Sequence, residues 1–104
     1  MIHSLWITLT LITHSPNIYD YKQFASHIIN NTQQMTCLDT LWTRESNWRP
    51  TANNPTSTAY GIPQILNLKE NNPYRQIIIG INYIEHTYKT PCKALNHHNH
   101  KGWY

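Results

Sequence analysis

Glu45 is the side chain of this sequence that is best placed for acid–base chemistry. It lies within residues 41–64, LWTRESNWRPTANNPTSTAYGIPQ, between Trp42 and Trp48. The chain has only five Asp and Glu residues, and no other acid lies between Glu45 and Glu70. Apolar rings around a carboxyl disfavour its charged form and raise its pKa, and a carboxyl that stays protonated can act as a general acid. Cleavage of a sugar–sugar bond is one reaction that such an acid serves.

The spacing of apolar residues predicts that Glu45 lies near the end of a helix. Thr36 is expected as the N-cap, and Pro50 must stop the helix. At helical spacing, Glu45 then shares one face of the helix with Cys37, Leu38, Leu41 and Trp42. The negative end of the helix dipole further disfavours a charged carboxylate there. An ion-paired surface glutamate beside Arg44 or Arg49 is the competing interpretation, and the place on an apolar face favours a functional group.

Three more helices are expected around this one. The first begins at Asp20 and ends near residues 30–32, or continues frayed to Met35. The second covers residues 74–88, where Gly80 indicates close packing against a neighbour. The last starts at Cys92, with Pro91 in its first turn. Residues 50–59 form a polar loop with a weak strand pattern that leaves room for a small hairpin. The fold class is therefore mainly α, with one short β-hairpin at most.

The composition narrows the class of partner. The chain has 104 residues, which fits one domain, and 12% of them are charged. The net charge of +3 gives mild attraction to an anionic cell wall, membrane surface or nucleic acid. The Lys and Arg residues are scattered without a basic run, which argues against a nucleic-acid partner.

Residues 1–15, MIHSLWITLTLITHS, form an apolar N-terminal segment. Its apolar core, residues 5–12, is too short to span a membrane, and no other stretch is long enough, so no stable membrane insertion is expected. The segment is either an ordinary first helix or strand, or a weak signal peptide that lacks Lys and Arg before its apolar part.

Cys37 and Cys92 allow two interpretations. They can be free buried thiols, or they can form a bridge that closes a loop of more than half the chain. A bridge of that loop length stabilises the fold by about 4 kcal/mol and requires an oxidising compartment.

His97, His98 and His100 form a histidine cluster that could bind a metal. Only the first and last share a helical face, and no acid within ten residues completes a ligand set. A solvated polar tail is favoured, and no metal or other cofactor is expected. Trp42 is expected in the core, and Trp48, beside the polar loop, is the better candidate for stacking on a sugar ring.

A family resemblance runs through the chain from about Asp20 to Tyr104. The motifs that carry it, in order, are Glu45-Ser46, residues 59–64 (AYGIPQ), Gln76-Ile77 with Gly80, Tyr83 and Ile84, Pro91-Cys92-x-Ala94, and Gly102-Trp103-Tyr104. In this combination the chain resembles lytic transglycosylase-like domains, including those of phage tail tape-measure proteins and secreted bacterial cell-wall proteins. Many relatives have a tryptophan where this chain has Leu95.

The resemblance implies a small lysozyme-like helical domain over residues 16–104, with a cleft that binds peptidoglycan glycan strands. Glu45 would be the single acid/base, and it would cleave the bond between N-acetylmuramic acid and N-acetylglucosamine with formation of a 1,6-anhydro end. No second carboxylate and no cofactor is required. A lysozyme-type hydrolase, and a non-catalytic wall-binding or virion structural module, are the alternatives. The protein would act outside the cytoplasm, secreted or virion-associated, as a monomer or as part of a virion assembly.

The resemblance also assigns roles to individual residues. Ser46 would brace the helix end, Gln64 would line the cleft as the glutamine of a Gly-x-x-Gln motif, and Tyr60 would flank the cleft floor. Tyr83 would reach toward the catalytic carboxyl, or it is a core tyrosine with a bonded hydroxyl. Cysteines at similar places in relatives imply that Cys37 pairs with Cys92.

Overall fold

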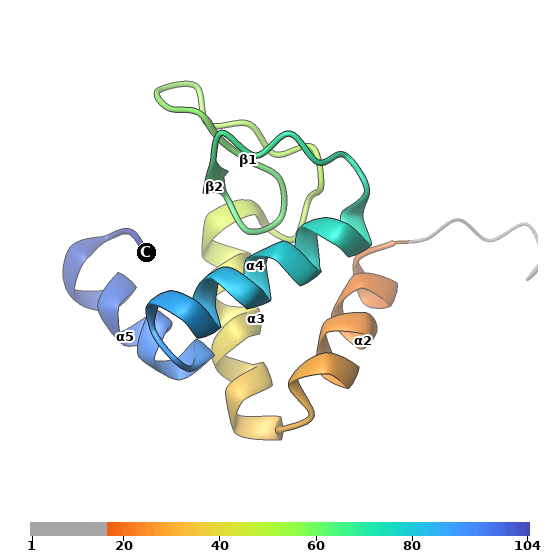
Figure 1. The fold of residues 1–104 in the computed structure, drawn as a ribbon, viewed down its shortest axis with the longest axis vertical. Helices are drawn as coiled ribbons and strands as arrows, with labels where there is room; N and C mark the ends of the chain where they lie inside the picture. The colour runs from red at the N-terminus through yellow and green to blue at the C-terminus, as the bar shows by residue number, and fades with distance from the viewer. Residues whose placement is uncertain (1–16) are drawn as a thin grey trace, which may run out of the picture.

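The computed structural model describes residues 17–104, and the expectation for residues 1–15 lies outside that range. The described chain is mainly helical with one short antiparallel hairpin, so the predicted fold class is confirmed. The elements in chain order are α2 (Ile18–Ile29), α3 (Thr32–Ser46), β1 (Ala59–Tyr60), β2 (Ile65–Leu66), α4 (Pro73–Thr87) and α5 (Pro91–Lys101) (Figure 1).

Asparagine side chains begin and end the first two helices. The Asn17 side chain accepts a hydrogen bond from the Asp20 backbone N–H, and Asp20 accepts one in return from the Asn17 N–H, which makes a capping box. Asn31 caps α3 by accepting from the Gln34 N–H at 2.9 Å. The prediction of Thr36 as this N-cap was wrong, because Asn31 starts the helix one turn earlier and the Thr36 hydroxyl donates inside it.

The last two helices begin close to the predicted positions. Asn72 caps α4 and Thr90 caps α5, and each helix has a proline at its first position, where no backbone N–H is needed. Of the isoleucines of α4, Ile77, Ile81 and Ile84 are buried, whereas Ile78 is 42% exposed.

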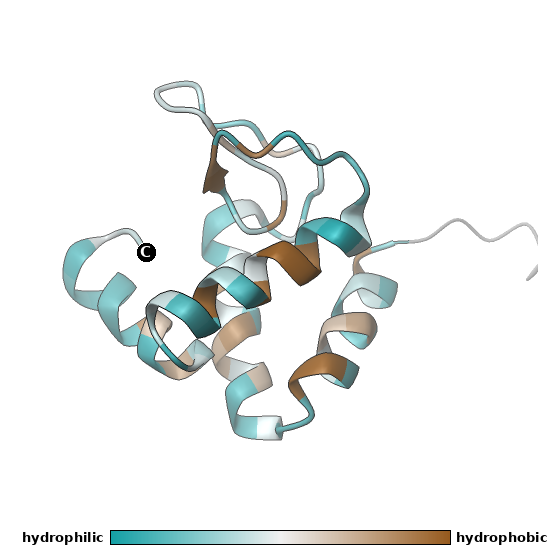
Figure 2. Ribbon diagram, viewed as in Figure 1, coloured by the Kyte–Doolittle hydropathy of each residue, from teal (hydrophilic) through white to brown (hydrophobic). Residues whose placement is uncertain are grey.

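The core lies between the apolar sides of the helices (Figure 2). Trp42 of α3 and Ile77 of α4 are fully buried in it. A Cβ atom on Gly80 would lie 2.6 Å from the Trp42 ring and 2.7 Å from the Pro63 side chain. The close packing predicted at Gly80 is therefore confirmed, because only a glycine lets α4 approach the tryptophan this closely.

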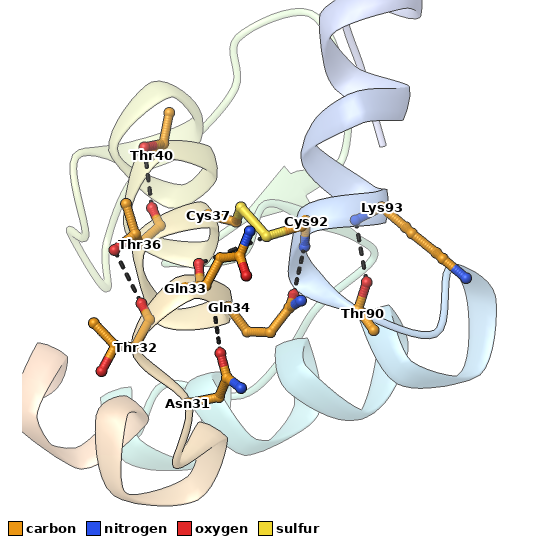
Figure 3. The surroundings of a disulfide bond; sticks show 10 residues. All are labelled: Asn31, Thr32, Gln33, Gln34, Thr36, Cys37, Thr40, Thr90, Cys92 and Lys93. Atoms are coloured by element: carbon orange, nitrogen blue, oxygen red, sulfur yellow. Dashed lines mark hydrogen bonds between the residues drawn. A yellow bond between two sulfur atoms is a disulfide. The ribbon is translucent and has the colours of Figure 1, made fainter.

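A disulfide joins Cys37 of α3 to Cys92 of α5, with the two Cα atoms 4.9 Å apart (Figure 3). Next to it, the Gln34 side chain accepts a hydrogen bond from the Cys92 backbone N–H at 2.9 Å. The bridge thus fastens the first part of α3 to the first turn of α5.

The hairpin lies later in the chain than expected. Ala59 pairs with Leu66 and Tyr60 with Ile65, so the turn is made by residues 61–64 and not within the polar loop of residues 50–59. Strand propensity in that loop is low, and the loop instead adds a single bridge between Asn53 and Tyr60.

One buried side chain fixes the hairpin turn to α4. Gln76 is fully buried, and its Oε1 accepts from the Ile62 N–H at 2.9 Å. Its Nε2 donates to the backbone carbonyls of Pro50 and Glu70 at 2.9 and 2.8 Å. Gly61, with φ +79°, lies so close that any Cβ there would overlap the Gln76 amide. The turn and the helix are therefore built as one unit.

Within residues 17–104, none of the helices has both the length and the apolar character that a membrane crossing needs.

Candidate active site

Glu45 lies in the last turn of α3, one residue before the helix ends at Ser46. This confirms the predicted position at a helix end. Its side chain is 20% exposed and lines a hollow of about 330 Å³. A second hollow of about 230 Å³ adjoins it, since both are lined by Gln64, Leu66 and Tyr104. Together they form one groove, which we call the cleft, with Glu45 in its larger part.

A histidine from α5 meets the Glu45 carboxyl. His98 Nε2 lies 3.3 Å from Glu45 Oε2, and the His98 side chain is 14% exposed. Partial burial raises the pKa of Glu45 above its usual value, and the nearby His98 opposes that rise. The net direction is upward, which favours the protonated form that an acid catalyst requires.

Ser46 braces the helix end and does not face the cleft. Its hydroxyl lies 2.6 Å from the Ile62 carbonyl oxygen, to which it donates, and the residue is 3% exposed. The contact fits the expected bracing role. The hydroxyl is buried and already engaged, so it is not available to bind a substrate as predicted.

Trp48 is not available to stack on a sugar, so that prediction was wrong. The residue is 1% exposed, its ring packs edge-on against Trp42 with centroids 5.1 Å apart, and its Nε1 donates to Asp39 Oδ1 at 2.9 Å. Asn47 and Trp48 both have left-handed backbone conformations, with φ of 56° and 58°. These two residues turn the chain sharply after α3 and direct the indole into the core.

Gln64 lines both hollows, as predicted for a cleft residue. Its Nε2 donates to the carbonyls of Ala52 and Gly61 at 2.9 and 3.0 Å, which fixes the side chain. Tyr60 lines neither hollow; it is half-buried and pairs through the hairpin backbone. The predicted place of Tyr60 beside the cleft floor is therefore not found among the residues that line the two hollows.

Tyr83 lines the smaller hollow within a cluster of aromatic rings. It makes edge contacts with Tyr104 and Tyr88, with centroids 5.7 and 6.3 Å apart. Among the described residues, His98 and not Tyr83 is the side chain that meets the Glu45 carboxyl. The interpretation of Tyr83 as part of a packed aromatic group fits these contacts better than a direct contact with the acid.

Sequence reasoning missed the contact of His98 with Glu45, and it missed several residues that line the cleft. These are Asn54 and Ser57 from the polar loop and the exposed ring of Trp103. Tyr104 was noted only as part of a motif, yet its hydroxyl accepts from Trp42 Nε1 at 2.9 Å and donates to the Pro63 carbonyl. Burial raises the pKa of Tyr104 well above its usual value. The motif of residues 102–104 and the histidine cluster mark some of these positions, but no local pattern shows that they meet at Glu45.

No protein-family model, curated protein or solved structure matches this chain. The lysozyme-like and transglycosylase-like character therefore stays a prediction, to be argued from the residues of the cleft themselves.

The other side-chain carboxylates lie away from the cleft. Asp20 caps α2, Asp39 binds the Trp48 indole and Lys22, and Glu70 accepts from the Asn72 N–H. Glu85 is exposed on α4. All five acids of the sequence lie in the described range, and Glu45 is the one side-chain carboxylate there that lines the cleft.

The three histidines of α5 point to different partners. His97 packs against the rings of Tyr88 and Trp103, and the His100 ring nitrogen Nδ1 contacts the Asn96 carbonyl at 2.8 Å. In the part of the chain that the structure describes, no group of three His, Cys, Asp or Glu side chains could hold a metal ion.

Proposed function

We propose that this chain is a peptidoglycan lytic transglycosylase. It cleaves the β-1,4 bond between N-acetylmuramic acid and N-acetylglucosamine, with Glu45 as the single acid/base. The observation that carries the proposal is a half-buried carboxyl with a raised pKa, unaccompanied by another side-chain carboxylate, in a groove lined by neutral polar groups.

The reaction needs two proton transfers by the same carboxyl. Protonated Glu45 donates its proton to the glycosidic oxygen, the bond from C1 to that oxygen breaks, and the N-acetylglucosamine end leaves as an alcohol. The substrate's acetamido oxygen stabilises the positive charge at C1. The Glu45 carboxylate then removes the proton from the C6 hydroxyl, and O6 bonds to C1 to close the 1,6-anhydro ring. Glu45 is protonated again at the end, and no cofactor is consumed.

The residues around Glu45 suit a glycan. Asn54, Ser57 and Gln64 supply amide and hydroxyl groups of the kind that bind sugar hydroxyls and acetamido groups. Trp103 lines the larger hollow and is 58% exposed, so the part of its ring that does not contact His97 can stack on the apolar face of a sugar. Charged side chains other than that of Glu45 are absent from the described lining, which fits a neutral sugar backbone.

The lack of a second carboxylate favours the anhydro product over hydrolysis. Most hydrolases that cleave glycosidic bonds use two carboxyl groups, one of which activates water or attacks C1. Here the C6 hydroxyl of the substrate replaces water as the nucleophile. A lysozyme-type hydrolase remains the second candidate, and a non-catalytic wall-binding or virion module is the third.

Charge and disulfide support a location outside the cytoplasm. The net charge of +3 attracts the chain to an anionic wall, and the Cys37–Cys92 bridge forms and persists in an oxidising compartment. The protein would act there as a secreted monomer or within a virion assembly.

Product analysis on purified peptidoglycan tests the proposal. The oxidised protein is incubated with sacculi, and the soluble products are separated and weighed by mass spectrometry. Anhydro-muropeptides support a transglycosylase, reducing-end muropeptides support a hydrolase, and intact sacculi support a binding module. Glu45→Gln should lower the rate by at least about a hundredfold, since it removes the proton that is transferred. Glu85→Gln, an exposed acid on α4, is the matched control. Equal rates for Glu45→Gln and wild type would refute the mechanism.

A further inference from the structure

The geometry points to His98 as a positioning residue that donates a hydrogen bond to Glu45 Oε2 and so leaves Oε1 as the oxygen that carries the transferable proton. This role belongs to the site of the proposed function and deepens it. It rests first on the 3.3 Å contact between His98 Nε2 and Oε2, which joins α5 to the last turn of α3.

Both partners of this contact are held in place from outside the pair. One residue before Glu45, the Arg44 guanidinium donates to the Asn99 side chain at 2.5 Å, which adds a second link between the same two helices. Toward the start of both helices, Cys37 and Cys92 are covalently joined. These two links hold α5 against α3, and so they hold the His98 imidazole next to the Glu45 carboxyl, as a positioning residue requires.

The second observation concerns the other nitrogen of the ring. His98 Nδ1 is buried and has no hydrogen-bond partner among the described residues. A hydrogen on Nδ1 would be an orphaned buried donor, and buried donors without partners are rarer than buried acceptors without partners. An imidazolium would bury a charged N–H in the same place, at still greater cost. The surroundings thus favour neutral His98 with its hydrogen on Nε2.

This tautomer fits both protonation states of Glu45. Nε2–H donates to Oε2 when the carboxyl is ionised, and it donates to the same oxygen as a carbonyl when Oε1 carries the proton. No proton has to move on the histidine during the reaction. The hydrogen bond strengthens when the carboxyl is charged, so His98 holds the pKa of Glu45 below the level that burial alone would produce.

Other ionisable groups near the pair have different partners. The Tyr104 hydroxyl lies between Trp42 and Pro63, and the Tyr83 and Tyr88 rings pack against Tyr104. On α5, His97 contacts aromatic rings, His100 contacts the Asn96 carbonyl, and Lys101 is exposed. On α3, Arg44 is bound to Asn99. Of the described residues, His98 is the one whose side chain lies within hydrogen-bonding distance of the Glu45 carboxyl.

The first test measures the protein without substrate, so it is independent of the proposed function. Nitrogen-15 NMR of the ring at pH 7 should show His98 as neutral, with a protonated Nε2 and a bare Nδ1. Carbon-13 NMR of the Glu45 carboxyl should show a titration midpoint at higher pH in His98→Leu than in wild type. His100→Leu, an exposed histidine on the same helix, should leave that midpoint unchanged. A hydrogen on Nδ1, or equal midpoints in wild type and His98→Leu, would overturn the inference.

The second test uses cleavage of peptidoglycan. His98→Leu should lower kcat/KM about tenfold or more, and it should move the alkaline limb of the pH profile to higher pH. His98→Gln keeps an N–H donor within reach of Oε2 and should recover most of the rate, although it cannot titrate. A purely structural role would change the melting temperature without moving the limb. If the NMR results hold and wild type cleaves nothing, the hydrogen bond stands and the proposed function fails.

Discussion

Replacement of Gln76 by leucine tests how much of the fold around the cleft depends on one buried polar side chain. Its amide forms hydrogen bonds with the Ile62 N–H and with the carbonyls of Pro50 and Glu70. It therefore joins the hairpin turn, and the chain on either side of the hairpin, to α4. Leucine has a similar volume but no polar atoms. All three backbone groups would therefore lose their partner while the core stays filled.

The magnitude follows from the burial of those groups. An unsatisfied buried polar group costs about 1–3 kcal/mol, and the Ile62 N–H is fully buried whereas the two carbonyls lie nearer the surface and can regain water. We expect a loss of about 3–5 kcal/mol, against a total stability of about 5–15 kcal/mol for a domain. For a domain of this size, that loss lowers the melting temperature by about 15 °C or more.

Urea unfolding followed by circular dichroism measures this loss, and amide hydrogen exchange locates it. Gln76→Leu should move the urea midpoint to lower concentration and should speed exchange at Ile62 and its neighbours in the turn. Gln23→Leu, an exposed glutamine on α2, is the matched control and should change stability by less than about 0.5 kcal/mol. If both variants have the same midpoint and the Ile62 amide stays protected, the hydrogen bonds of Gln76 do not hold the turn as described.

Three further predictions concern the disulfide and two tryptophans. Replacing Cys37 and Cys92 together with serine should reduce the free energy of unfolding by about 4 kcal/mol, measured by urea unfolding, because the unfolded chain regains the entropy of a long open loop. Wild type treated with a reductant should match the double variant, and a difference below about 1 kcal/mol would show that the bridge constrains little. Trp103→Ala should weaken glycan binding, measured by titration with chitooligosaccharides, and leave the melting temperature nearly unchanged, since the ring is 58% exposed. Trp48→Phe should lower the melting temperature and leave glycan binding unchanged, because the indole is buried and donates a hydrogen bond to Asp39. A loss of glycan binding in folded Trp48→Phe would contradict the place of Trp48 in the core.

Features set by neighbours in sequence were predictable. The inner faces of α3 and α4 follow helical spacing, and Pro73 and Pro91 mark the starts of α4 and α5. The position of Glu45 at a helix end follows from the same local rules. Even here the start of α3 was missed, because Asn31 and Thr36 are both good N-caps and only the folded chain distinguishes them.

Features set by distant neighbours were not predictable. Trp48 was assigned to the cleft because nothing in its flanking residues announces two successive left-handed conformations. His98 meets Glu45 across a separation of 53 residues, and helical periodicity does not tell which helices become neighbours. Gln76 has the polarity of a surface residue, yet its place in the core depends on three backbone groups that only the folded loop presents.

The disulfide between α3 and α5 affects when the Glu45–His98 contact can form and persist. Cys37 precedes Glu45 as Cys92 precedes His98, so the two helices run in the same direction, and the hairpin and α4 form the return path between them. Single helices form within about a microsecond, but a contact across such a path waits for the whole path to close. Once that contact has formed and the cysteines are oxidised, the bridge holds α5 against α3 and limits how far the two helices can separate again. In a reducing cytoplasm the chain lacks the stabilisation of about 4 kcal/mol that the bridge supplies, so the contact between α3 and α5 is weaker. If the proposed function is right, the Glu45–His98 pair becomes fully held in place only after export to an oxidising space.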